Sequence, residues 1–126
     1  MEKKRILLVD DNPDITQTIK TILETTGKYE VLEINQGIDA VAAARIFRPD
    51  LALLDVMMPD LDGNEIAEQF NADENLQHIK IVFLTAIVTA AEVKAGAVSD
   101  ITGYPVLPKP VKIKTLLGFI GKMLQD

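Results

Sequence analysis

The chain has 126 residues, of which 48% are hydrophobic and 25% are charged, and its formal net charge is −6. This length suits one domain with its own buried core, so we expect a single domain over residues 1–126. The chain has no cysteine, which excludes disulfides and thiolate metal or redox sites. Its negative charge argues against direct nucleic-acid binding, which depends on Lys and Arg contacts to phosphates.

The N-terminal sequence argues against export and against insertion into a membrane. Residues 1–5 include basic side chains, but the apolar stretch after them stops at Asp10. That stretch is too short for the apolar core of a signal peptide or for a membrane-spanning helix. We therefore expect a cytoplasmic protein that does not associate with a membrane.

Short apolar runs alternate along the chain with longer segments in which apolar residues recur at helical spacing. In chain order, we predict a strand at 5–9, a helix from Pro13 that ends before Gly27, a strand at 30–34, a helix at 40–47, a strand at 51–54, a helix after Gly63, a strand at 79–84, a short helix at 89–95, a strand at 104–107 and a helix at 113–124. Such alternation indicates a doubly wound α/β domain, with a five-stranded parallel sheet covered by helices on both faces.

Two segments refine this prediction. Residues 51–54 are continuously apolar, as expected for a central parallel strand that is covered on both faces. Residues 96–103 mix glycine with serine, aspartate and threonine, which disfavours a regular helix. We therefore expect the fourth helix to be short, displaced or mobile.

Polar residues stand at the ends of several predicted strands. Asp10 and Asp11 end the first strand, Asp55 the third and Thr85 the fourth, and Lys109 follows the fifth closely. Each of them alone would be an ordinary turn, cap or solvated residue. Because ligands of doubly wound sheets bind outside the carboxyl ends of the strands, we expect all five side chains to meet at one edge of the sheet.

The residue types in this group suit phosphoryl chemistry. Clustered carboxylates must be neutralised by protons or by a cation, and oxygen ligands without His or Cys favour Mg²⁺. An aspartate beside such an ion can attack phosphorus and form an acyl phosphate, while a fixed ammonium neutralises developing charge. We interpret Asp60 and Asp62, in the Pro/Gly-containing loop after Asp55, as residues that stabilise their turn.

Four segments resemble, in order, the signatures of the receiver domain of two-component response regulators, in the CheY-like superfamily. They are residues 7–12 (Leu-Leu-Val-Asp-Asp-Asn), 53–63 (Leu-Leu-Asp-Val-Met-Met-Pro-Asp-Leu-Asp-Gly), 84–86 (Leu-Thr-Ala) and 107–110 (Leu-Pro-Lys-Pro). The resemblance covers essentially the whole chain, and its second segment is the most specific. It implies a flavodoxin-like fold.

The resemblance also implies roles for the acidic residues. Asp55 would accept a phosphoryl group from the phosphohistidine of a sensor histidine kinase or from a phosphotransfer protein. Asp11 would bind Mg²⁺ directly, and Asp10 would do so largely through metal-bound water. The backbone carbonyl of Met57 would complete the metal site.

The same resemblance places the switch at Thr85 and Lys109. The Thr85 hydroxyl would follow the phosphoryl group, Lys109 would bind its oxygens, and the result would alter a protein-interaction surface near the last two helices. Family members usually carry Tyr or Phe three residues before the lysine, where this chain has Val106. By strand alternation, Tyr104 should face the same side of the sheet as Val106, at a different height.

Met57 and Ile87 occupy the two variable positions that flank the phosphorylation site in the family. Both are apolar and sizeable, so they offer no group to orient an attacking water and would shield an acyl phosphate. We therefore predict slow self-dephosphorylation.

The predicted function is that of a signalling switch whose only chemistry is its own phosphorylation and dephosphorylation. One alternative is a pseudo-receiver, an interaction module that is not phosphorylated. A second is a phosphotransferase or a haloacid-dehalogenase-like phosphatase, but such enzymes usually need a second acid where this chain has Met57. The downstream effector, homodimerisation and membership of a longer regulator stay open from the sequence.

Overall fold

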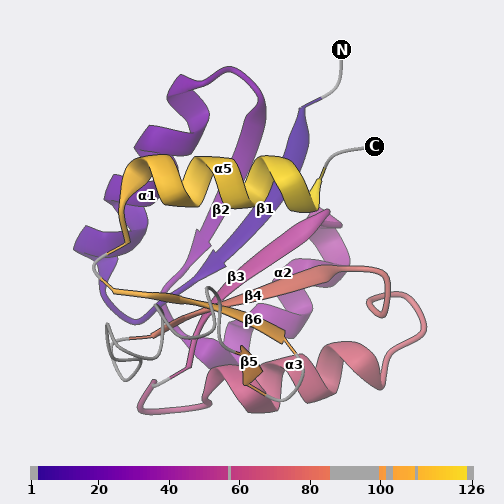
Figure 1. Ribbon diagram of the computed structural model, residues 1–126. Coiled ribbons are helices and arrows are strands. Elements are labelled where there is room, and N and C mark those ends of the chain that lie inside the picture. The colour runs from indigo at the N-terminus through magenta and orange to yellow at the C-terminus, as the bar shows by residue number, and fades with distance from the viewer. Residues whose placement is uncertain (1–2, 57, 86–99, 102–103, 110, 125–126) are drawn as a thin grey trace.

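The computed structural model describes residues 3–56, 58–85, 100–101, 104–109 and 111–124. The strands are β1 (Lys4–Val9), β2 (Tyr29–Ile34), β3 (Leu51–Asp55), β4 (Lys80–Thr85), β5 (Asp100–Ile101) and β6 (Tyr104–Pro108). The helices are α1 (Pro13–Thr25), α2 (Ala40–Phe47), α3 (Gly63–Asn71) and α5 (Ile113–Met123), as Figure 1 shows, and the short 3-10 helix η1 (Gly37–Asp39) precedes α2. Within the described ranges, no helix has the length and apolarity needed to span a membrane.

The strands form one sheet in the order β2-β1-β3-β4-β6-β5. The first five strands in this order are parallel, which confirms the predicted parallel sheet. The two-residue strand β5 is an addition that the sequence did not predict, and it pairs antiparallel with the start of β6 through Ile101 and Tyr104. The predicted short helix at 89–95 lies outside the described residues, whereas Asp100 and Ile101 are strand rather than helix.

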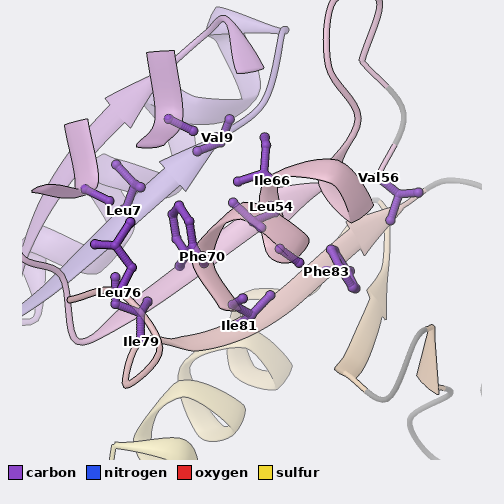
Figure 2. Packing of buried hydrophobic residues seen from close by; sticks show 14 of the residues in the cluster. Leu7, Val9, Leu54, Val56, Ile66, Phe70, Leu76, Ile79, Ile81 and Phe83 are labelled. Carbon is purple, nitrogen blue, oxygen red and sulfur yellow. The ribbon is translucent and has the colours of Figure 1, made fainter. Parts of the chain in front are cut away.

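Helices cover both faces of the sheet, with α1 and α5 on one face and α2 and α3 on the other (Figure 1). Alternate side chains of each strand enter the two cores. In β1, Ile6 and Leu8 pack towards α1 and α5, and Leu7 and Val9 pack towards α2 and α3. Figure 2 shows the second of these cores, where apolar side chains of α3 pack on those of β1, β3 and β4.

The helices that follow β1 and β3 begin with side-chain caps, which fix the loops at the carboxyl ends of these strands. The Asn12 side chain accepts a hydrogen bond from the backbone N–H of Asp14, and Pro13 provides a favourable first helical residue. At the start of α3, Asp62 accepts a hydrogen bond from the N–H of Glu65 at 3.0 Å. Asp62 thus stabilises its turn as predicted.

Asp60 does more than stabilise its own turn. Its carboxylate accepts hydrogen bonds from the backbone N–H groups of Gly37 at 3.3 Å and Ile38 at 3.0 Å, at the start of η1. These bonds, that of Ile38 first, hold the pKa of Asp60 below its usual value. The same contact is close enough that a Cβ on Gly37 would lie 2.4 Å from the Leu61 carbonyl oxygen. The loop after β3 is therefore fastened to the loop after β2.

Candidate functional site

Asp10, Asp55 and Thr85 lie together at the carboxyl edge of the sheet, because β1, β3 and β4 are neighbours in nearly level register. All three side chains are buried, with exposed fractions of 0%, 5% and 0%. The chain turns back across the sheet between β1 and β3, and this reversal of strand order is where doubly wound sheets bind ligands. The structure thus brings these residues to the edge at which the sequence predicted a site.

The three carboxylates of the site come close to one another. Asp10, Asp11 and Asp55 each offer an oxygen atom, and these atoms lie within 4.8 Å of one another. Asp11 is exposed, whereas the other two residues are buried. Negative charges at this spacing repel, so the cluster favours a cation among its oxygen atoms.

Lys109 supplies one positive charge to this cluster. Its ammonium donates a hydrogen bond to Asp10 Oδ2 and lies 3.3 Å from Asp55 Oδ2. Burial alone would lower the pKa of Lys109, but the hydrogen bond and charge of Asp10, together with Asp55, raise it above the usual value. Lys109 therefore stays protonated at neutral pH and links Asp10, the residue after β1, to Asp55, the last residue of β3.

Backbone hydrogen bonds set the position of both ends of this ion-pair network. The N–H of Lys109 donates to the Thr85 carbonyl at 3.0 Å, which fixes the residue after β6 against the end of β4. The second oxygen of Asp10 accepts a hydrogen bond from the N–H of Asn12 at 3.0 Å. The side chains of Asp10 and Lys109 are thus oriented by the loops that carry them.

The start of α3 approaches the backbone of Asp55 closely. The N–H of Gly63 donates to the Val56 carbonyl at 3.1 Å. A Cβ on Gly63 would lie 2.5 Å from the Asp55 carbonyl oxygen and 3.2 Å from Cε1 of Phe83. Only glycine allows this approach without displacing the backbone of Asp55.

Val106 and Tyr104 face the same side of the sheet, as strand alternation predicted, because both belong to the core under α2 and α3. Val106 is buried beside Phe83, its register partner in β4. The Tyr104 ring meets Phe83 edge to face, with ring centroids 5.7 Å apart, and its hydroxyl accepts a hydrogen bond from Asn71 of α3. The Tyr104 ring is thus held against Phe83 by the ring contact and by the hydrogen bond from Asn71. Met57 and Ile87 lie outside the described residues.

A polar group that the sequence did not predict is formed by Thr16, Glu33 and Asn35, and it reaches the backbone of Asp10 through Asn35. Thr16 is fully buried and hydrogen bonds to Glu33 and Asn35. Two signals could have revealed it. Thr16 falls on the helical stripe that includes the buried residues Ile19 and Leu23, and Glu33 follows the inward alternation of Tyr29 and Val31, so each is a polar residue at an inward position.

The family model of the response regulator receiver domain matches residues 6–120, and the chain belongs to this family. The DNA-binding response regulator MtrA of Mycolicibacterium smegmatis is 33% identical over 123 residues, which are 98% of this chain but 51% of MtrA. The polar-differentiation response regulator DivK of Brucella anthropi is 27% identical over 123 residues, which are 98% of each chain. This chain therefore spans about half the length of MtrA and nearly all of DivK.

A solved structure agrees with this assignment. The receiver domain of a sensor histidine kinase from Pseudomonas aeruginosa PAO1 is 30% identical, with a TM-score of 0.80, and the match covers 99% of this chain and 100% of that one. That crystal structure holds a magnesium ion in its active-site cleft. The predicted resemblance and fold class are confirmed, and the chain is a signalling domain of two-component systems.

Proposed function

We propose that this receiver domain accepts a phosphoryl group on Asp55 in a Mg²⁺-dependent reaction and thereby switches a protein-interaction surface. The observation that carries the proposal is the convergence of Asp10, Asp11 and Asp55 within 4.8 Å, with Lys109 contacting two of them. We propose further that residues 1–126 form a single cytoplasmic domain whose only chemistry is on itself.

The residues present fit a magnesium ion. Three carboxylate oxygens at this spacing, without His or Cys, form the hard oxygen donor set that Mg²⁺ prefers. Asp10, Asp11 and Asp55 would hold the ion together with the backbone carbonyl of Met57, which lies outside the described residues. Mg²⁺ bound there would neutralise charge on the carboxylates and on phosphoryl oxygens.

Asp55 is the proposed phosphoacceptor because it is the buried carboxylate at the end of the central strand. One of its carboxylate oxygens forms a bond to phosphorus, while the P–N bond of a phosphohistidine breaks and its electron pair stays on the imidazole nitrogen. Lys109 is placed to neutralise charge on the incoming phosphoryl oxygens. The donor is a sensor histidine kinase or a phosphotransfer protein.

The output of the switch begins at Lys109 and Thr85. The new phosphoryl group carries about two negative charges, against one on the carboxylate that it modifies. It therefore draws Lys109 and the Thr85 hydroxyl towards itself and away from the arrangement of the unmodified domain. Because the N–H of Lys109 is bonded to the Thr85 carbonyl, the ends of β4 and β6 respond together. We propose that a downstream effector binds the surface formed beyond these strands.

The direct test is phosphorylation with a small donor. The domain is incubated with Mg²⁺ and a phosphoramidate, and intact mass is measured for the wild type, Asp55→Asn and Asp62→Asn. Asp62→Asn is the matched control, because it makes the same chemical change at a nearby carboxylate that caps α3. We expect the wild type and D62N to gain the mass of one phosphoryl group and D55N to gain none.

Beryllofluoride, which mimics the phosphoryl group, gives an independent readout. In the presence of Mg²⁺ it should shift the amide NMR signals of Thr85 and Lys109 in the wild type but not in D55N. A wild-type domain that neither gains mass nor responds to beryllofluoride would contradict the proposal. Such a domain would instead act as an interaction module that is not phosphorylated.

A further inference from the structure

A chain of hydrogen bonds runs behind the acidic cluster and joins α1, the end of β2 and the loop that carries Asp10. The Thr16 hydroxyl donates to Glu33 Oε2 at 2.6 Å and lies 3.1 Å from the Pro13 carbonyl oxygen. The side-chain amide of Asn35 donates one hydrogen bond to Thr16 Oγ1 at 3.0 Å and another to the Asp10 carbonyl at 2.9 Å. The last of these hydrogen bonds is thus made to the backbone of Asp10, a residue of the acidic cluster.

Packing alone does not explain these polar side chains. Thr16 is fully buried on the face of α1 that also carries Ile19 and Leu23, where an apolar residue would pack without needing a partner. Glu33 stands on the inward side of β2, in alternation with Val31. A partly buried polar network of this kind is retained at a cost in desolvation and rigidifies what it contacts. The group that this network holds in place is the Asp10 carbonyl.

Both polar groups of the Asp10 backbone are held by the end of β2. The N–H donates to the Ile34 carbonyl at 3.0 Å, and the carbonyl accepts from Asn35 at 2.9 Å. The Asp10 carbonyl belongs to the planar peptide unit whose nitrogen is that of Asp11. Fixing this plane therefore fixes the Asp11 N and Cα atoms, the point from which the Asp11 side chain leaves the backbone.

The consequence falls on Asp11 rather than on the Asp10 side chain. The Asp10 carboxylate is already held by the N–H of Asn12 and by Lys109. Asp11 is exposed, yet its carboxylate lies within the 4.8 Å cluster with Asp10 and Asp55. Packing restrains an exposed side chain little, so the orientation of the backbone contributes to holding the Asp11 carboxylate in this position.

We infer that Asn35, itself oriented by Thr16 and Glu33, is a positioning residue of the metal site that holds the Asp10–Asp11 peptide plane and so aims the Asp11 carboxylate at Asp55. The inference deepens the proposed function and rests on it for the identity of the ion. It predicts that the network acts on metal affinity and on the order of Asp11, rather than only on stability.

Four variants test this role. Asn35→Ala removes the donor to the Asp10 carbonyl, and Thr16→Val removes the hydroxyl with little change of shape. Thr16→Ser keeps the hydroxyl and should restore wild-type behaviour. Thr18→Val is the matched control, because the Thr18 hydroxyl donates only within α1, to the Asp14 carbonyl at 2.8 Å. Urea denaturation of each variant separates a loss of stability from the readouts that follow.

The first readout is a Mg²⁺ titration followed by amide NMR. We expect N35A and T16V to weaken Mg²⁺ binding by about 10-fold, as removal of groups that orient metal ligands commonly does, and T16S and T18V to stay within about 2-fold of the wild type. The beryllofluoride response should need more Mg²⁺ in N35A but reach the wild-type amplitude when Mg²⁺ is saturating. Equal Mg²⁺ affinity in N35A, T16V and the wild type would overturn the inference.

The second readout needs no metal. In the metal-free protein, ¹⁵N relaxation of the Asp11 amide should report larger motion in N35A and T16V than in T16S or T18V. Unchanged motion of Asp11 in N35A would overturn the inference even if stability fell. If the wild type takes up no Mg²⁺, the proposed function fails, while this relaxation measurement still decides whether Asn35 orders Asp11.

Discussion

Replacement of Gly63 by alanine should destabilise the domain and disturb the site in one step. A Cβ there would lie 2.5 Å from the Asp55 carbonyl oxygen, a backbone atom that cannot rotate away, and 3.2 Å from the Phe83 ring. Overpacking of this kind costs about 3 kcal/mol at the upper end of its usual range. Gly63 is the first residue of α3, so alanine returns less than the roughly 1 kcal/mol of helix propensity of an interior position, and we expect a net loss of about 2 kcal/mol.

The assay is thermal unfolding followed by circular dichroism, where about 2 kcal/mol corresponds to a fall in Tm of about 8 °C for a domain of this size. Gly118→Ala is the matched control, because Gly118 lies within α5 and a Cβ there would meet no atom within 4 Å. We expect that control to raise Tm by about 4 °C, from about 1 kcal/mol of helix propensity.

The two glycine variants should also differ at the site. G63A displaces the backbone of Asp55, so it should slow phosphorylation by the small donor even in the fraction that is folded, whereas G118A should leave the rate unchanged. A G63A domain that is as stable as the wild type and is phosphorylated as fast would refute the claim that α3 is packed directly on the acceptor backbone.

Three further predictions follow from other parts of the structure. The pKa of Lys109 is raised above 10.5, so the pairing of Lys109 stabilises the metal-free fold below pH 10.5, and this stabilisation is lost as pH rises through the raised pKa. Urea titrations above pH 10.5 should therefore show a steeper loss of stability with pH in the wild type than in Lys109→Met. Equal slopes would contradict the pairing. Arg48 caps the end of α2 in the left-handed region, at φ 55° and ψ 62°. Arg48→Gly should therefore raise the urea midpoint by relieving about 1 kcal/mol of backbone strain. A lower midpoint would show that the arginine side chain contributes more than this strain costs. Replacing Met57 or Ile87 by asparagine should shorten the lifetime of the acyl phosphate in an intact-mass time course, and an unchanged lifetime would remove the shielding hypothesis.

The fold could be predicted because its information is local. Residues 51–54 are continuously apolar, and every one of them is fully buried in β3. Asp55 and Thr85 end their strands, so parallel pairing alone brings them to one edge. The placement of Lys109 was less direct to predict, because Lys109 follows β6 rather than ending it. It is the next residue after the strand, however, and so lies at the same edge of the sheet.

What escaped prediction depends on how separate elements are placed against one another. Asp60 looks like a turn residue in the sequence, yet its carboxylate bonds to backbone N–H groups 22 and 23 positions earlier in the chain. Asn35 reaches the Asp10 carbonyl across 25 positions in the same way. The spacing of residues along the sequence indicates neither of these hydrogen-bond partners. The strand β5 was missed because two residues are too few to show alternation.

The composition of β6 has a consequence for how the domain behaves in solution. This strand reads Tyr-Pro-Val-Leu-Pro, and its prolines have no N–H. Because the N–H of Lys109 points to β4 and N–H groups alternate along a strand, Pro108 is the proline that leaves the outer side without a donor. Among the described residues, the outer side of β6 is paired at its first two residues, where β5 lies antiparallel to it. An edge that lacks a donor at Pro108 is a poorer template for adding a foreign strand. Pro108 thus opposes intermolecular β-pairing at this edge of the sheet, and it should help the domain stay dispersed at high protein concentration.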